Sequence, residues 1–268
     1  MNIEDLYANV LPSVRGCPHI TALDALQAAA VEFCRRTLVW RKTLPAVASV
    51  LAPLIFTGPL VAAYGATLTA AFTGTTRTDY LLTFSDGTYQ VVTLNNGSTT
   101  VTWANPVTAT ASATYSQVTY AIQVPTDAAV SKLLGFTVGG IKRRVVSPEF
   151  GEDLTDFRFS EDAAWTVDRI NFNVSPPPAA AGIQYGLKVA LQPTSNAMTL
   201  PDEIGNTYGE ELAYGALYRL QRMNDRQWSN DQDALRNRQD FNLRIGIVAA
   251  QAAKGFGRGR LRVKAHFF

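Results

Sequence analysis

A nearly uncharged stretch interrupts the chain between two segments of ordinary composition, and it restricts the possible folds more than any other feature. Over residues 53–117, Thr, Ala, Val, Gly and aromatic residues dominate. Its charged residues are Arg77, Asp79 and Asp86. The pairs Asp86-Gly87 and Asn96-Gly97 separate short runs in which apolar residues alternate, as expected of tight hairpin turns between strands. The stretch therefore predicts a small antiparallel sandwich inserted into another fold.

The flanking segments have helical patterns. Residues 3–14 predict a short helix, and Thr21 with Asp24 predicts the cap of a second one. The apolar stripe of that second helix has the three-and-four spacing of one helix face: Leu23, Leu26, Ala30, Phe33, Thr37 and Trp40. Cys34 in this helix is expected to be a free buried thiol.

Two long helices are expected to close the chain. The first begins near Pro201, and the second follows a Ser229/Gln232 capping box and ends at Gly255. The last helix carries Phe241, Ile245, Val248 and Ala252, with Leu243 and Ile247 beside them. So wide an apolar face predicts burial on two sides.

Strands are expected between these helices. Their ranges are 119–124, 133–138, 141–146, 166–174 and 183–191, with Gly139-Gly140 as a hairpin turn and 148–162 as an acidic loop. The predicted fold class is α+β, a helical bundle with a small antiparallel sheet that carries an inserted all-β immunoglobulin-like sandwich. The predicted domains are a core of residues 1–52 and 118–268, an insert of residues 53–117, and an extended basic tail of residues 256–268.

Residues suited to catalysis or metal binding do not form a recognisable pattern. Cys17 lies near His19 in the sequence, but a nucleophile and its base are matched in space rather than by adjacency. The chain has no G-x-S-x-G and no C-x-x-C motif, and GFGRGR at 255–260 follows a helix instead of opening one. Two acidic groups are interpreted as solvated faces: Glu210 with Glu211, and Glu152 with Asp153 and Asp156. We therefore expect no enzyme activity, no catalytic residue, no cofactor and no metal.

Two other groups of residues predict packing or binding. Gly205, Gly209 and Ala213 form a ridge of small residues suited to subunit or helix packing. In the tail, apolar and basic residues alternate, which is typical of an extended amphipathic strand that pairs with a partner; a disordered basic end is the alternative. The tail residues expected to bind are Phe256, Arg258, Arg260, Leu261, Arg262, Val263, Lys264, Phe267 and Phe268.

Several segments, in order, resemble bacteriophage head-to-tail adaptor proteins, also called connector or head-completion proteins. They are IEDLYANVLPSVRGCP with the helix ALDALQAAAVEFCRRTLVWRKTL, then YAIQVPTDAAVSKLLGF, then LKVALQPTSNAMTLPDEIGNTYGEELAYGALYRLQRMNDRQWSNDQ, and finally AAQAAKGFGRGRLRVKAHFF. The resemblance implies a structural virion protein of the neck that forms a ring, commonly of twelve copies, beneath the portal protein. It also implies contacts with tail or nozzle proteins, and passage of genomic DNA through the ring without sequence-specific binding.

The insert departs from a plain adaptor, and it resembles immunoglobulin-like modules of phage structural proteins. An adhesion or glycan-binding virion protein that works through this insert, with Trp103 or Tyr115 stacking on sugars, is therefore an alternative. Direct DNA binding through the basic tail is a second alternative, because the chain from residue 241 onward has six Lys or Arg residues and no acidic one. The acidic start MNIEDLY is unlike a signal peptide, and Pro53, Gly58 and Pro59 break the longest apolar run. We therefore expect no membrane association, and assembly in the host cytoplasm.

Overall fold

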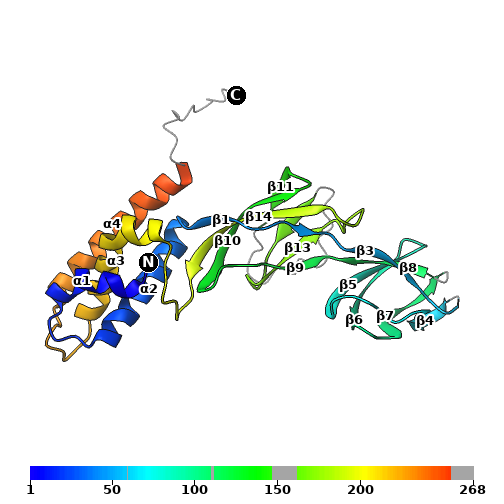
Figure 1. Ribbon diagram of the computed structural model, residues 1–268, viewed down its shortest axis with the longest axis horizontal. Helices are drawn as coiled ribbons and strands as arrows, with labels where there is room; N and C mark the ends of the chain where they lie inside the picture. Colours follow the sequence, from blue (N-terminus) through cyan, green and yellow to red (C-terminus); the bar gives the residue numbers. More distant parts are fainter. Residues whose placement is uncertain (59, 110–111, 147–161, 255–268) are drawn as a thin grey trace, which may run out of the picture. The chain divides into compact units, whose positions relative to one another are not determined.

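The structure is a computed structural model that describes residues 1–58, 60–109, 112–146 and 162–254 (Figure 1). These residues fall into two compact units. The helical unit contains Met1–Lys42, Pro125–Lys132 and the chain from Ala190 onward, and the β unit contains Thr43–Val124 and Leu133–Val189.

The helical unit is built around two long antiparallel helices near the end of the chain and one near its start. Its elements are η1 (Ile3–Leu6), α1 (Tyr7–Val10), η2 (Leu11–Ser13), α2 (His19–Thr37), α3 (Asp202–Gln221) and α4 (Asp231–Lys254). Both α4 and the η1–α1 segment pack against α2 and α3. The shared core contains the expected stripe residues Leu26, Ala30 and Phe33, together with Leu212 and Phe241.

The helix starts differ from the predicted ones. Pro18, not Thr21, precedes the first turn of α2, and it makes no side-chain cap. At α4 the cap is Asn230 rather than Ser229: Asn230 Oδ1 accepts the Asp233 N–H at 3.2 Å, and Asn230 Nδ2 donates to the Asp233 carboxylate at 2.6 Å. The Ser229 hydroxyl instead donates to the Gln221 carbonyl. Where several residues in a row can cap, the local backbone decides which one does.

The principal sheet has eight strands in the order β1-β14-β10-β11-β12-β13-β9, and β2 also pairs with β14. The strands are β1 (Arg41–Thr43), β2 (Val47–Ala48), β9 (Thr119–Ala121), β10 (Ala128–Val138), β11 (Ile141–Val145), β12 (Ala163–Trp165), β13 (Asn171–Ser175) and β14 (Gln184–Pro193). β10 and β11 form the hairpin predicted at Gly139-Gly140, with Val138 opposite Ile141. β11 and β12 run parallel.

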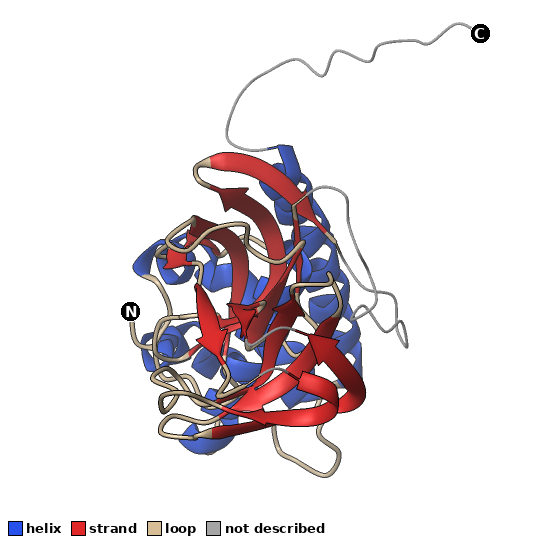
Figure 2. Cartoon of the chain, turned by 90° about the vertical axis from the view of Figure 1, so that its right-hand side faces the viewer, coloured by secondary structure: helices blue, strands red, loops and turns tan. Residues whose placement is uncertain are grey.

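The predicted helical bundle with a small sheet is wrong. Strands make up 37% and helices 32% of the structure, and Figure 2 shows how much of the chain is strand. The sequence pattern predicts only a small sheet beside the helices, but β10 and β14 are 11 and 10 residues long. Strands of that length leave many backbone groups to be paired, so they recruit neighbours into a large sheet.

Residues 51–117 form two antiparallel sheets around a core of their own. The strands are β3 (Leu51–Ile55), β4 (Leu60–Thr67), β5 (Arg77–Phe84), β6 (Tyr89–Leu94), β7 (Thr100–Ala109) and β8 (Ser112–Gln117). One sheet has the order β3-β8-β5-β6, and the other pairs β4 with β7. We call this pair of sheets the sandwich.

One of the two predicted hairpin turns of the sandwich is confirmed and the other is wrong. Asp86-Gly87 joins the paired strands β5 and β6, and Gly87 has the expected positive φ of 82°. Gly97 also has a positive φ of 83°, but β7 then pairs with β4 in the other sheet rather than with β6. The Gly97 N–H donates to the Phe72 carbonyl at 2.8 Å, so this turn closes against a distant loop and directs the chain across the sandwich.

Aromatic side chains fill the sandwich core. Tyr80, Leu82 and Phe84 are buried on one face of β5, as their alternation predicted. The Trp103 ring lies 5.3 Å from that of Phe84, and its Nε1 donates to the Ala63 carbonyl at 2.9 Å. Trp103 is therefore a core residue.

The sandwich should be removable without unfolding the rest of the chain. β3 and β8 are paired with Leu51 opposite Ser116, and directly opposed Cα atoms lie about 4.5–5.5 Å apart in such a ladder. We expect a variant in which Asn-Gly joins Leu51 to Ser116 to keep the helical circular dichroism signal and one cooperative unfolding transition. Leu82→Ala in the full chain is the matched control, because it should destabilise the sandwich alone. Loss of helical signal in the deletion variant would contradict the predicted insert.

Candidate functional site

The side of α4 that faces away from the core is apolar, and no described part of the chain covers it. α4 buries Ala234, Phe241, Ile245 and Val248 against the helical unit. On its opposite side, Leu235, Leu243 and Ile247 are 61%, 63% and 46% exposed. At about 3.6 residues per turn these positions share one face, the α4 outer face, whose members are Leu235, Gln239, Leu243, Gly246, Ile247 and Ala250. The predicted burial on two sides is thus met on one side only within the described chain.

Gly246 lies in the middle of the α4 outer face. A Cβ added at this position would have no described atom within 4 Å. Glycine inside a helix costs about 1 kcal/mol relative to alanine. Nothing in the described part of the chain compensates for that cost. A glycine here would, however, let the backbone of another molecule approach closely.

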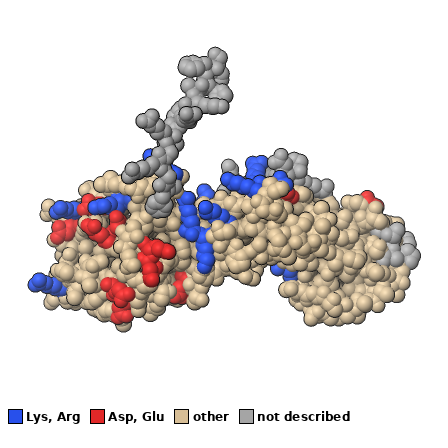
Figure 3. All heavy atoms as spheres, turned by 45° about the horizontal axis from the view of Figure 1, so that its top comes forward, with Lys and Arg blue, Asp and Glu red and all other residues tan. Residues whose placement is uncertain are grey.

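The charges around the α4 outer face are basic. Arg236 and Lys254 lie along one edge of this face, and both are exposed. Of the acidic residues of α4, Asp231 and Asp233 are in the first turn, and the half-buried Asp240 borders the face on the side of Tyr214. On the face visible in Figure 3, charged side chains gather on the helices, whereas the sandwich is almost free of them.

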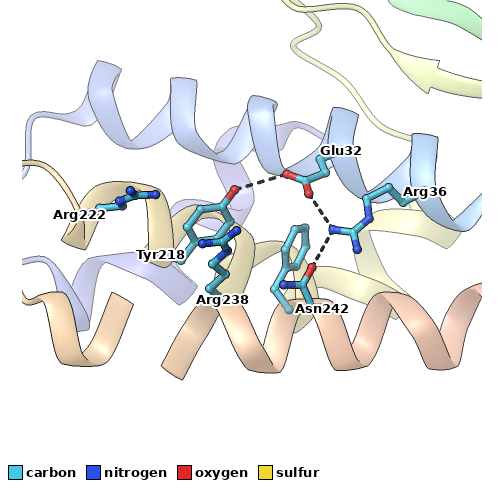
Figure 4. Close-up of a pocket in the computed structure, with 7 residues that line it drawn as sticks. Glu32, Arg36, Tyr218, Arg222, Arg238 and Asn242 are labelled. Carbon is cyan, nitrogen blue, oxygen red and sulfur yellow. Dashed lines mark hydrogen bonds and ion pairs between the residues drawn. The ribbon is translucent and has the colours of Figure 1, made fainter. Parts of the chain in front are cut away.

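A second feature of the helical unit is a hollow of about 150 Å³ between α2, α3 and α4. It is lined by Glu32, Arg36, Tyr218, Arg222, Arg238, Phe241 and Asn242 (Figure 4). The Glu32 carboxylate accepts a hydrogen bond from Arg36 at 2.8 Å and another from Arg219. Arg36 also donates to Asn242 Oδ1 at 2.7 Å. These contacts link α2 to both α3 and α4.

The electrostatics of this hollow argue for a structural role. Burial would raise the pKa of Glu32, but the hydrogen bonds and charges of Arg36 and Arg219 outweigh burial and hold that pKa below its ordinary value. A carboxylate that is stabilised as an anion and occupied by two arginines is a poor proton acceptor. The hydrogen bonds around the hollow therefore hold α2, α3 and α4 together, and the residues that line it are not arranged for acid–base chemistry.

Glu32→Gln is expected to lower the free energy of unfolding by about 2 kcal/mol at neutral pH, because it leaves two arginines without their anionic partner. The folded-state pKa of Glu32 is depressed, so its contribution is complete above the ordinary pKa of 4.5 and is lost as the pH falls through the folded-state value. The difference between the two proteins should therefore shrink below pH 4.5 in urea titrations. Glu203→Gln, at an exposed position, is the control, and a difference that grows in acid would contradict the assignment.

The predicted site residues lie in different places. The tail residues 256–268, His266 and the acidic group of Glu152, Asp153 and Asp156 are outside the described residues. The ridge of small residues faces inward: Gly205 lies against Met1, Gly209 lies against Leu6, and Ala213 is buried. The ridge is therefore used for packing within the chain, and a contact between subunits would need another surface.

Cys17 and His19, which are neighbours in the sequence, each contact a different group in the structure. The Cys17 thiol donates to the Pro18 carbonyl at 3.5 Å, while His19 Nε2 lies 3.2 Å from the Glu4 carboxylate. Cys34 is a free buried thiol, as predicted, and burial raises its pKa to about 12. Across the described ranges no group of three His, Cys, Asp or Glu side chains could hold a metal ion.

Glu210 and Glu211 are both engaged by neighbours within the helical unit. Glu210 accepts from the Tyr214 hydroxyl at 2.9 Å, and the Glu211 carboxylate lies 3.8 Å from Arg244.

No protein-family model matches the chain, and no curated protein matches it. Among the described residues, no helix combines the length and apolar character needed to cross a membrane.

Proposed function

We propose that the chain is a structural subunit of a tailed-phage neck, a head-to-tail adaptor that forms a ring beneath the portal and lets the genome pass. The observation that supports this proposal best is the α4 outer face. An apolar helix face of this size, with a glycine that nothing in the described chain contacts, is suited to burial against another protein. The ordered resemblance of the flanking segments to adaptor proteins indicates the kind of assembly that the chain would join.

The charge pattern favours a closed ring over a symmetric pair. Two α4 outer faces packed on each other would bring Arg236 and Lys254 of one copy near those of the other, and the half-buried Asp240 at the border of the face offsets only part of that charge. A head-to-tail contact between different faces avoids this repulsion. Repeated around a rotation axis, such a contact closes into a ring.

The same proposal assigns the remaining partners. The portal and the tail or nozzle proteins would cover the two ends of the ring, and DNA would pass through it without sequence-specific contacts. The formal net charge of +2 in 268 residues is too small to suggest a strong general affinity for nucleic acid.

The glycan-binding alternative depends on exposed aromatic side chains at Trp103 or Tyr115. Trp103 is buried in the sandwich core, and the Tyr115 ring lies 5.3 Å from Phe72 and 5.6 Å from Tyr80. Trp103 is therefore not placed to stack on a sugar, and Tyr115 is partly buried against the sandwich core.

The test is electron microscopy of the purified chain, alone and together with the portal protein encoded in the same genome. We expect rings that bind one end of the portal, and light scattering should give the mass of a closed oligomer. The double variant Val167→Glu/Ile170→Glu, which alters exposed apolar residues of the β unit, should assemble like the wild type. Monomers alone in every mixture would overturn the proposal, and salt-dependent retention of DNA by those monomers would favour direct DNA binding.

A further inference from the structure

A second exposed apolar patch lies on the helical unit, at the start of α2. Ile20 is 73% exposed and Met198 is 54% exposed, and Asp24 is exposed one turn after Ile20 on the same side of the helix. We call Ile20, Asp24 and Met198 the α2 patch. Asp24 adds one exposed acidic side chain to these two apolar residues.

The α2 patch is held in place by buried hydrogen bonds. Gln27 is buried, and its Nε2 donates to the Ala197 carbonyl at 2.9 Å and lies 3.7 Å from Met198 Sδ. The Met198 carbonyl accepts from the Ile3 N–H at 2.9 Å. Because the backbone at residues 197–198 is fixed on α2, little conformational entropy would be lost when a partner covers the patch.

The surroundings of the α2 patch carry the opposite charge to those of the α4 outer face. Besides Asp24, the η1 segment that packs against α2 contributes Glu4 and Asp5, both exposed. The α4 outer face has apolar residues of similar size with Arg236 and Lys254. Apolar contact and charge pairing can therefore be satisfied together when one surface covers the other.

The two surfaces belong to different parts of the helical unit. α4 meets α2 in its second half, through Phe33 beside Phe241 and through Arg36, which donates to Asn242. In the α2 patch, Ile20 and Asp24 lie in the first two turns of α2, and Met198 lies against Gln27 in the next turn. One copy can therefore use both surfaces at once, each toward a different neighbour.

We propose that the ring contact is made by the α4 outer face of one copy on the α2 patch of the next. This inference rests on the proposed ring function, and it specifies the surface that occupies the α4 outer face. Gly246 lets the two helices approach closely, while Leu243 and Ile247 pack beside Ile20 and Met198. Arg236 and Lys254 then lie near Asp24, Glu4 and Asp5.

Variants that block one surface at a time test this contact. The first variant, Leu243→Glu/Ile247→Glu, blocks the α4 outer face, and the second, Ile20→Glu/Met198→Glu, blocks the α2 patch. All four positions are exposed, so both variants should fold with the wild-type circular dichroism spectrum. Each variant alone should stay monomeric in mass photometry. An equimolar mixture should give a heterodimer of twice the 29.1 kDa chain mass and nothing larger, because only one productive contact remains.

The controls separate this inference from the function on which it rests. Wild type and Val167→Glu/Ile170→Glu should form rings under the same conditions. If the α2-patch variant forms rings like the wild type, or if the mixture stays monomeric while the wild type forms rings, the contact is wrong although the ring function stands. If the wild type alone is monomeric at every concentration, the direct contact between copies is also wrong, and the adaptor function is decided by the portal experiment.

Discussion

Phe241→Ala is expected to lower the free energy of unfolding of the helical unit by about 3–5 kcal/mol, the range for truncating a large buried aromatic side chain. Phe241 is 1% exposed, and its ring lies 6.5 Å from that of Phe33 and 6.1 Å from that of Tyr218. A Cβ at Gly215 would lie 2.8 Å from the Phe241 ring, so the ring rests directly on the α3 backbone. Helices held this closely cannot collapse far into the cavity that alanine would leave.

Leu243→Ala provides the matched control two residues away on the same helix. Leu243 is exposed, so its truncation should change the free energy of unfolding by less than about 0.5 kcal/mol. Urea denaturation followed by the helical circular dichroism signal measures both variants under conditions in which the protein is monomeric. Similar losses in the two variants would mean that the buried and outer faces of α4 are wrongly assigned.

Substitution of Gly246 should have opposite effects on the isolated chain and on its assembly, and Gly246→Ala tests the first of these effects. In the monomer it should raise the free energy of unfolding by about 1 kcal/mol, because alanine is the better helix former and its Cβ meets open space. Gly246→Leu should fill the close approach between helices and weaken assembly by about tenfold or more, since overpacking costs about 1–3 kcal/mol at each contact.

The measurements for Gly246 are denaturation of the monomer and the concentration dependence of ring formation in mass photometry. Gln251→Ala, at an exposed position on another side of α4, is the control and should leave assembly unchanged. Assembly of Gly246→Leu with wild-type affinity would show that no backbone approaches this glycine.

The sequence pattern located the helices well but not their ends. The three-and-four spacing around Phe33 predicted α2, because burial of one face is a repeated signal over many residues. A cap depends on one residue, and Asn230 and Ser229 are both capable of it. The same limit applies to the sandwich turns. Asp86-Gly87 and Asn96-Gly97 carry the same local preference, and they differ because the second turn is hydrogen-bonded to the distant loop of residues 72–76.

The large sheet could not be derived from the sequence because its pairings are long-range. β13 and β9 bring Asn171 opposite Ala121, and no local signal indicates that register. The strand ranges alone therefore understated the sheet and led to the wrong fold class.

The α4 outer face was only partly predictable. The helical spacing of apolar residues placed Leu243 and Ile247 on a wide apolar face of the last helix. Whether another part of the protein covers them depends on residues far along the chain. The ridge at Gly205 and Gly209 shows the same limit, because Met1 and Leu6 occupy it from about two hundred positions away.

The pairing of β3 with β8 has a mechanical consequence for a chain under load. Leu51 and Ser116 are opposite each other, so tension carried along the backbone can cross from one strand to its neighbour through their ladder of hydrogen bonds. The strands between them then lie outside the path of the force. While that ladder holds, the sandwich can remain folded as the rest of the chain is strained. The stability of the sandwich then does not limit the force that the rest of the chain can bear.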